Sequence, residues 1–446
     1  MPDPGRPRLT VLGTGYLGAT HAVCMASLGY EVLGLDVDEA KVAALAAGTV
    51  PFFEPGLPEL LAEQLASGRL RFTTSYEEAG AFGDVHFLCV GTPQKKGEYA
   101  ADLTYVDAAF ASLLPHLREG ALVVGKSTVP AGTAERLAVV LDDGLAAGTV
   151  APGVELAWNP EFLREGFAVQ DTLSPDRLVF GVRSERARLQ LEAAYAPVLA
   201  RPTPVVVTDF ATAQLVKVAA NAFLATKISF INAMAEVCEA TGGDVTLLSK
   251  ALSYDERIGG RFLHAGLGFG WGCLPKDIRA FMARAGELGV DQALSFLREV
   301  DAINLRRRAR MVDLAREESG GSFGGMRVAV LGAAFKPNSD DIRDSPALDV
   351  AATVQRQGAA VTLYDPKAMD NCRLRHPELG YRDSVGEAVK GADLVLHLTE
   401  WAEFRELDPE ELGGMVAAKR IVDGRNALDP ALWRAAGWTY RALGRP

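Results

Sequence analysis

Short apolar runs alternate with longer amphipathic stretches through the N-terminal half of the chain. The apolar runs cover residues 9–12, 32–35, 85–90, 121–124, 155–158 and 178–181. Such alternation of strand-like and helix-like segments is typical of an α/β fold with a parallel, doubly wound sheet. We therefore expect this part of the chain to form one such sheet.

A long helical pattern follows at residues 209–240. Thr208-Asp209 forms a plausible N-cap for it, and Gly242-Gly243 marks its end. At 1.5 Å per residue such a helix is about 45 Å long. It is long enough to connect two domains.

A glycine-rich linker at residues 319–325 precedes a second strand-helix-strand pattern, which runs from residue 327 to residues 364–366. The chain is thus expected to contain two α/β domains on either side of a helical middle. We place the boundaries at 1–205, 206–318 and 319–446.

Composition narrows the class of protein further. At 446 residues, with 48% hydrophobic and 23% charged residues, the chain matches a globular protein of two or three domains. The net charge of -11 argues against nucleic acid as a partner. Neither an apolar run long enough to span a bilayer nor a signal-peptide core is evident, and we expect a cytoplasmic protein without a membrane partner. The scattered cysteines and unpaired histidines indicate neither disulfides nor a metal site.

A dinucleotide-binding fingerprint directly follows the first apolar run. Residues 13–18 read GTGYLG, and Asp36 lies at the end of the second run. Glycines at this spacing between a strand and a helix let a pyrophosphate approach the helix N-terminus, and the acid accepts hydrogen bonds from the ribose hydroxyls. Together they predict NAD, in preference to NADP, as the cofactor.

Cys273 lies in a glycine-rich loop that leads into a predicted helix start. Pro275 suits the first turn of a helix, and a thiol beside Lys276 at a helix N-terminus is favoured as thiolate. Asp277 lies four residues after Cys273, on the same helical face. The alternative is a buried structural cysteine.

Two further patterns indicate residues that could bind a substrate alcohol or a phosphate group. Lys217 and Asn221 share a face of the long helix, where they are able to hydrogen-bond an alcohol oxygen and assist its deprotonation. In the second α/β domain, Lys336 and Arg343 lie near a strand-helix turn that suits phosphates, although Asp340-Asp341 is equally compatible with a charged surface turn.

These residues resemble the nucleotide-sugar 6-dehydrogenases of the UDP-glucose/GDP-mannose dehydrogenase type over nearly the whole chain. The motifs that carry the likeness are GTGYLG at 13–18, VGTP at 90–93, STVPAGT at 127–133, NPEFLREG at 159–166, Lys217 with NAFLA at 221–225, GCLPKD at 272–277, FK at 335–336, DDIR at 340–343 and DGRN at 423–426.

The resemblance implies two Rossmann-like doubly wound domains, joined by a long central helix and a helical dimerisation domain. It also implies a four-electron oxidation: the sugar C6 alcohol is oxidised by one NAD, Cys273 holds the aldehyde as a thiohemiacetal, a second NAD yields the thioester, and water releases the acid. The resemblance further implies that the product serves polysaccharide or glycoconjugate synthesis. A homodimer or higher homo-oligomer is expected.

The resemblance also assigns site residues. The implied catalytic residues are Cys273, Lys217, Asn221, Asp277, Glu161 and Thr128. The implied cofactor contacts are Gly13, Gly15, Tyr16, Leu17, Gly18, Asp36, Lys41, Thr92, Thr128, Glu165 and Arg343. The implied substrate contacts are Glu161, Phe162, Leu163, Lys217, Asn221, Arg257 (from a partner subunit), Phe262, Gly270, Phe335, Lys336 and Arg425.

Several substrates and one non-enzymatic role stay open at this point. The motif at residues 159–166 favours UDP-glucose, while GDP-mannose and a UDP-N-acetylhexosamine remain alternatives. A bulky Trp271 stands before Gly272 and Cys273 where many members carry small residues, which would reshape the sugar pocket. A non-catalytic nucleotide-binding protein is disfavoured because the catalytic set is intact. A two-electron β-hydroxyacid dehydrogenase needs neither Cys273 nor a third domain.

Overall fold

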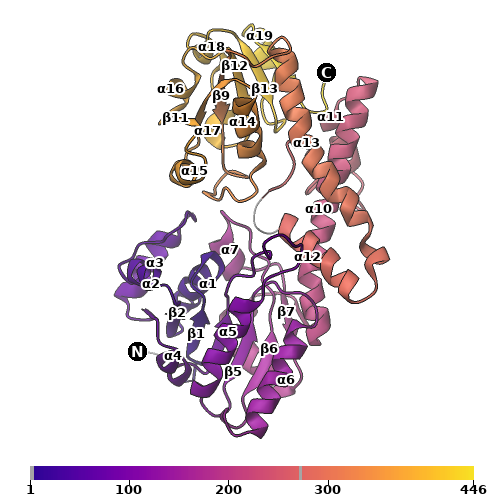
Figure 1. Cartoon of the computed structure of the whole chain (residues 1–446). Coiled ribbons are helices and arrows are strands. Elements are labelled where there is room, and N and C mark those ends of the chain that lie inside the picture. Colours follow the sequence, from indigo (N-terminus) through magenta and orange to yellow (C-terminus); the bar gives the residue numbers. More distant parts are fainter. Residues whose placement is uncertain (1–4, 271–273) are drawn as a thin grey trace. The chain divides into compact units, whose positions relative to one another are not determined.

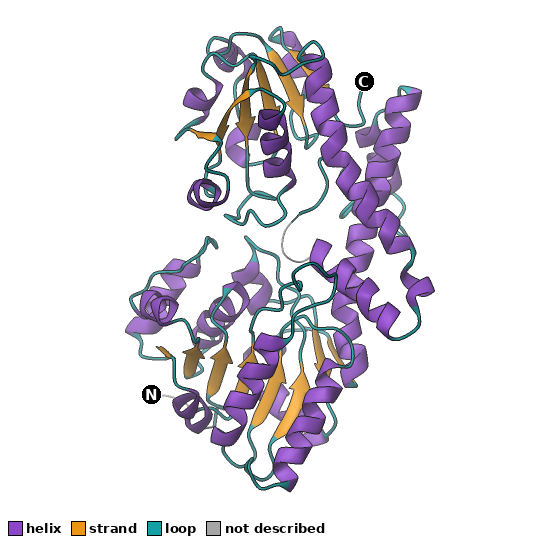
Figure 2. Ribbon diagram, in the orientation of Figure 1, coloured by secondary structure: helices purple, strands orange, loops and turns teal. Residues whose placement is uncertain are grey.

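The computed structural model describes residues 5–270 and 274–446 (Figure 1). The chain divides into two compact units. The first comprises Met1–Ala220 and Arg279–Gly289, and the second comprises Asn221–Ile278 and Val290–Pro446. Figure 2 shows that each unit contains a sheet with helices on both faces.

The sheet of the first unit has eight strands in the order β3-β2-β1-β4-β5-β6-β7-β8. Their bounds are β1 Leu9–Leu12, β2 Val32–Leu35, β3 Leu70–Thr73, β4 Val85–Leu88, β5 Leu122–Gly125, β6 Glu155–Trp158, β7 Leu178–Gly181 and β8 Val205–Thr208. The pairing is parallel except between β6 and β7, which are antiparallel. The predicted strands are all present, and the order reverses between β1 and β4, where ligands bind in such sheets.

Helices cover this sheet on both sides. Their bounds are α1 Tyr16–Ser27, α2 Glu39–Ala46, α3 Leu57–Ala66, α4 Tyr76–Phe82, α5 Thr104–Leu113, α6 Thr133–Ala146, α7 Ala168–Leu173, α8 Glu185–Ala194 and α9 Ala196–Leu199, with a 3-10 turn at Leu114–His116. Successive strand residues enter different cores: Leu9 and Val11 pack with α1 and α3, whereas Leu12 packs with α5 and α6. Side chains of a strand alternate between its faces, so both faces of this sheet are buried.

The second unit has a six-stranded, wholly parallel sheet in the order β11-β10-β9-β12-β13-β14. Its strands are β9 Arg327–Leu331, β10 Ala360–Tyr364, β11 Gly380–Tyr381, β12 Leu394–His397, β13 Arg420–Asp423 and β14 Thr439–Ala442. Its helices are α11 Val245–Ser253, α13 Phe296–Glu318, α14 Pro346–Arg356, α15 Met369–Arg375, α16 Val385–Val389, α17 Ala402–Arg405, α18 Pro409–Gly413 and α19 Pro430–Ala435, with a 3-10 turn at Asp291–Leu294. This is the same strand order as in the first six strands of the other sheet, which supports the expected relation between the two folds.

Two helices pass from one unit to the other, namely α10 (Phe210–Thr241) and α12 (Leu274–Glu287). The start and end predicted for α10 are confirmed, because Asp209 Oδ1 accepts the Thr212 N–H at 2.7 Å and Gly242 follows the helix with φ +76°.

By length and composition α10 also meets the requirements of a membrane-crossing helix, so the expectation of no such apolar run was wrong. Within the protein, 44% of its most apolar segment is buried.

Candidate active site

The turn between β1 and α1 has the shape that the GTGYLG fingerprint predicts. Gly13 has φ +87°, and a Cβ on it would lie 2.8 Å from Val90 Cα. A Cβ on Gly18 would lie 1.8 Å from the Gly13 carbonyl oxygen, so the helix start packs directly on the turn. Gly15, the N-cap, faces open space, with no atom within 4 Å of a Cβ placed there. A dinucleotide pyrophosphate fits here, because the open position lies at the positive end of α1.

Asp36 is buried at the carboxyl end of β2, where the ribose-binding acid is expected. Its Oδ2 accepts hydrogen bonds from the Thr14 N–H at 2.8 Å and from Lys41 Nζ at 2.9 Å, and its Oδ1 accepts from Asp38 N–H at 3.1 Å. Burial raises the pKa of Asp36, but Lys41 and the backbone donors outweigh it and hold the pKa below its usual value. Asp36 is therefore ionised and oriented beside the fingerprint turn.

The loops that follow β4 and β5 are tied together at the same edge of the sheet. Thr92 Oγ1 donates to the Thr128 carbonyl oxygen at 2.8 Å. Thr92 follows β4, which flanks the reversal in strand order, and Thr128 follows the neighbouring strand β5. Thr92 therefore lies at the edge where ligands bind in sheets of this kind, and the cofactor contacts of Thr92 and Thr128 stay predictions.

Lys217 forms a buried ion pair in the first unit. Its Nζ lies 2.9 Å from Glu161 Oε1, and both side chains are at most one-tenth exposed. Glu161 Oε2 accepts the Leu163 N–H at 2.6 Å, and the Phe162 ring lies against Lys217 and Arg177. The structure thus brings together four of the residues expected from the motif at 159–166 and from α10.

A second buried lysine, Lys126, lies next to these segments and was not predicted. Its Nζ donates to Asn159 Oδ1 at 3.0 Å and to Tyr195 Oη at 3.1 Å. Burial lowers the pKa of Lys126 to about 8. Because Lys126 precedes Thr128 by two residues and Asn159 precedes Glu161 by two, this hydrogen bond links the two loops on which Thr128 and Glu161 lie.

Glu54 is the second residue that was not predicted. It is only 2% exposed, and its carboxylate accepts the Gly166 N–H at 2.6 Å, the Ala168 N–H at 2.7 Å and the hydroxyl of Tyr16. Burial, with Glu54 as hydrogen-bond partner, raises the pKa of Tyr16 above its usual value. The adjacent Glu165, an expected cofactor contact, is buried as well.

In the second unit, Asn221 and Asp277 are brought together. Asn221 Nδ2 donates to Asp277 Oδ2 at 2.7 Å, and Lys276 Nζ lies 2.8 Å from Asp277 Oδ1. Asp277 is almost completely buried. The helix expected after Cys273 is present, since α12 begins at Leu274. Cys273 itself lies outside the described residues, as do Trp271 and Gly272.

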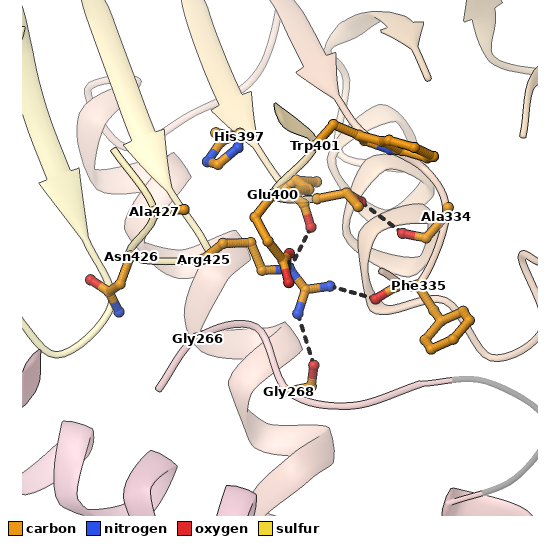
Figure 3. Close-up of polar contacts among 12 residues, drawn as sticks. Gly266, Gly268, Ala334, Phe335, His397, Glu400, Trp401, Arg425, Asn426 and Ala427 are labelled. Carbon is orange, nitrogen blue, oxygen red and sulfur yellow. Dashed lines mark hydrogen bonds and ion pairs between the residues drawn. The ribbon is translucent and has the colours of Figure 1, made fainter. Parts of the chain in front are cut away.

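Figure 3 shows Arg425, which follows β13, in contact with three chain segments of the second unit. Its guanidinium donates to the carbonyl oxygens of Leu398 at 2.7 Å, Gly268 at 3.0 Å and Phe335 at 3.0 Å, and it pairs with Glu400 at 3.3 Å. All of its nitrogens are therefore engaged by the protein, whereas the resemblance assigns Arg425 to the substrate.

The remaining expected substrate contacts of this unit lie in different surroundings. Lys336 Nζ lies 5.3 Å from the centroid of the Phe335 ring, and Phe262 has a left-handed φ of +65°. Gly270 leaves no room for a side chain, because its Cβ would lie 2.4 Å from the Asp344 carbonyl oxygen. Arg257 is exposed and pairs with Asp255.

Arg343 is likewise exposed and paired within its own loop. Its Nε lies 3.0 Å from Asp341 Oδ1, as expected if this segment is a charged surface turn. The contact to cofactor that the resemblance implies for Arg343 stays a prediction.

Asp365 occupies in the second sheet the position that Asp36 occupies in the first. It accepts hydrogen bonds from the backbone N–H groups of Ala333, Ala334, Lys367 and Ala368, and from the indole of Trp401. Such a saturated carboxylate has no capacity left for ribose hydroxyls.

No cluster of three metal-ligating side chains occurs among the described residues.

Comparison with known proteins agrees with this geometry. Family models for the UDP-glucose/GDP-mannose dehydrogenase family match the NAD binding domain at residues 7–199, the central domain at 211–306 and the UDP binding domain at 329–430.

Similar proteins extend over the full chain. A UDP-glucose 6-dehydrogenase of Rhizobium meliloti is 41% identical over 441 residues, covering 98% of this chain and 100% of its own. Among solved structures, a UDP-glucose dehydrogenase from Pyrobaculum islandicum matches with a TM-score of 0.89 and 37% identity over 100% of both chains. A UDP-D-ManNAc dehydrogenase from Pyrococcus horikoshii matches with a TM-score of 0.85 and 29% identity, over 98% of this chain and 99% of that one. From its domain matches and its full-length likeness, this chain belongs to the UDP-glucose/GDP-mannose dehydrogenase family.

Proposed function

We propose that this protein is an NAD-dependent UDP-glucose 6-dehydrogenase, which oxidises the C6 alcohol of UDP-glucose to the carboxylate of UDP-glucuronate. The observation that carries the proposal is the 41% identity with the Rhizobium meliloti enzyme over 441 residues. The higher identity to a UDP-glucose dehydrogenase structure, 37% against 29% for the UDP-D-ManNAc enzyme, supports this substrate over an acetamido sugar.

The buried pair of Lys217 and Glu161 supports a role at the reacting oxygen. A lysine ammonium that is held in an apolar surrounding by a carboxylate donates to an alkoxide or a tetrahedral oxyanion more strongly than it would in water. The Gly13 to Gly18 turn would hold NAD, which would supply the hydride acceptor for each oxidation. Asn221, four residues after Lys217 on α10, would supply a further hydrogen-bond donor.

Cys273 would attack the C6 aldehyde through its sulfur, and the oxyanion would gain a proton to give a thiohemiacetal. The start of α12 directly after Cys273 supports a thiolate, because a helix N-terminus lowers the pKa of a thiol. Asp277, fixed by Asn221 and Lys276, would organise a proton or water on this helix. Glu161 and Thr128 would position the water that cleaves the thioester and releases the acid.

The second unit would hold the nucleotide diphosphate. Lys336 would supply the cation, while Phe335, Phe262 and the side-chain-free Gly270 would shape the site. Arg343 would contact cofactor. We place the three domains at residues 1–205, 206–318 and 319–446.

The protein would act in the cytoplasm as a homodimer, without a nucleic-acid or membrane partner. An exposed apolar stripe on α10, made of Phe223, Phe230 and Val237, supports the dimer. The spacing of seven residues puts these three side chains on one helix face. Arg257, exposed on each subunit, would reach the site of the partner.

Stoichiometry tests the four-electron route. The wild type should form two NADH per UDP-glucuronate, measured by absorbance and by chromatography of the acid. A ratio of one with free aldehyde would overturn it. The variant Cys273→Ala should lose acid formation and keep NADH binding.

Turnover of four nucleotide sugars tests the substrate assignment. kcat/KM for UDP-glucose should exceed that for GDP-mannose, UDP-N-acetylglucosamine and UDP-N-acetylmannosamine at least about tenfold, because a base or sugar that fails to pair leaves buried polar groups unsatisfied. A higher value for any of the other three would transfer the assignment to that sugar. Activity with none of them would favour a non-catalytic nucleotide-binding role.

A further inference from the structure

Glu54 connects two segments that both carry expected cofactor contacts. On one side is Tyr16, the first residue of α1 and part of the GTGYLG turn. On the other side is the loop 159–167, in which Gly166 comes immediately after Glu165 and five residues after Glu161. Glu54 itself comes from the connection between α2 and α3, distant in sequence from both.

The carboxylate meets donors on both of its oxygens. Oε1 accepts the Ala168 N–H at 2.7 Å, while Oε2 accepts the Gly166 N–H at 2.6 Å and the Tyr16 hydroxyl. The Gly166 N–H also approaches Tyr16 Oη at 3.2 Å, so the three groups form a closed network. Gly166 has φ +77°, a conformation that glycine adopts readily.

Because the network is buried, a donor or acceptor in it that loses its partner is costly in free energy. At 2% exposure Glu54 is shielded from water, and the Phe52 ring packs on Tyr16 with centroids 4.8 Å apart. Among the described ion pairs none involves Glu54, so its charge is met by these peptide and phenol donors. A glutamine at this position would turn its NH₂ group toward one of the two peptide N–H groups, whichever way the amide is oriented, and donor would face donor.

We propose that Glu54 is a positioning residue that locks the start of α1 to the loop 159–167 and thereby presets the NAD site. The inference rests on the proposed function only in taking NAD as the ligand. Glu54 acts through Tyr16 and the backbone of Gly166 and Ala168, and it does not contact the reacting atoms.

NADH fluorescence gives a readout that is independent of turnover. For Glu54→Gln we expect the dissociation constant of NADH to rise about tenfold or more, since one charge-assisted hydrogen bond is lost and another is opposed. The dissociation constant of UDP, measured by calorimetry, should stay within twofold, which also shows that the variant is folded. The matched control is Glu59→Gln, the same change on the exposed side of α3, which should leave both constants unchanged.

A second variant tests the network with a smaller perturbation. Tyr16→Phe removes only the hydroxyl, and we expect NADH to bind two- to threefold more weakly. In the Glu54→Gln background the same change should have almost no further effect, because both substitutions break one network.

NADH affinity of Glu54→Gln within twofold of wild type would overturn the inference, as would full additivity of the two substitutions. If the wild type reduces no NAD with any nucleotide sugar while NADH binding still depends on Glu54, the proposed function fails and the positioning role of Glu54 stands.

Discussion

We expect a single side chain, Asp36, to decide the choice between NAD and NADP. Its ionised carboxylate would face the 2'-phosphate of NADP, and two unit charges about 4 Å apart repel by roughly 4 kcal/mol at an effective dielectric constant near 20. Lys41, 2.9 Å from Asp36, offsets part of this repulsion. We therefore expect kcat/KM for NAD to exceed that for NADP by at least about a hundredfold.

Steady-state kinetics with both cofactors check this expectation. Asp36→Asn should reduce the preference, because it removes the charge and keeps the shape. A wild-type enzyme that uses both cofactors equally would show that Lys41 neutralises Asp36 completely.

Lys336 and Arg425 were assigned to the same ligand by resemblance, but their surroundings differ. Arg425 is engaged by three carbonyl groups and Glu400, so Arg425→Ala should destabilise the second unit by about 2 kcal/mol or more, besides any effect on the substrate. Lys336→Ala should raise the KM for the nucleotide sugar and leave the KM for NAD and the melting temperature nearly unchanged. Thermal denaturation and substrate titrations of both variants distinguish these roles. If Arg425→Ala melts like the wild type, its contacts with the carbonyl groups contribute little.

Among the elements, the turn between β1 and α1 combines two different requirements for glycine. An alanine at Gly18 would put its Cβ 1.8 Å from the Gly13 carbonyl oxygen, whereas one at Gly15 would meet no protein atom within 4 Å. We expect Gly18→Ala to lower the melting temperature and abolish NADH binding. Gly15→Ala should lose NADH binding and retain the wild-type melting temperature. Equal melting temperatures for the two variants would contradict this difference.

Strands and helices with strong patterns were predictable from the sequence. The long helix is an example, because its Asp209 cap and Gly242 stop are local signals. The strands β3 and β8 were missed, since Leu70–Thr73 has only a weak apolar pattern and Val205–Thr208 is a half-exposed edge strand. The antiparallel pairing of β7 with β6 was also unexpected, because an apolar run does not encode its direction.

Site residues were predictable only where they belong to a recognisable sequence motif. The roles of Glu54 and Lys126 depend on partners far away in the chain, such as Gly166 and Tyr195, and a single glutamate or lysine in a loop carries no local signal of this. The hydrogen bonds that occupy the Arg425 guanidinium also come from segments distant in the sequence, so the sequence did not predict them. The assignments of Cys273 and of the other catalytic residues stay predictions.

For the whole molecule, the exposed stripe on α10 leads to a prediction about assembly. Phe230→Glu places a charge within the stripe and should convert the proposed dimer into a monomer, measured by light scattering during gel filtration. The monomer should bind NADH normally but turn over nucleotide sugar poorly, because Arg257 of the partner is then missing. Leu374→Glu, an equally drastic change at an exposed residue of α15, is the control and should remain dimeric. A dimeric Phe230→Glu variant would place the interface elsewhere.

The five hydrogen bonds that occupy the Asp365 carboxylate have a kinetic consequence for the protein as a whole. They leave a single dinucleotide turn among the described residues, yet a four-electron oxidation consumes two equivalents of NAD. On the proposed four-electron route, the first unit would exchange its cofactor midway through the reaction while the half-oxidised sugar nucleotide stays bound to the chain. The half-oxidised sugar nucleotide would then have to stay bound for longer than that exchange takes, and a slow release of NADH would limit turnover.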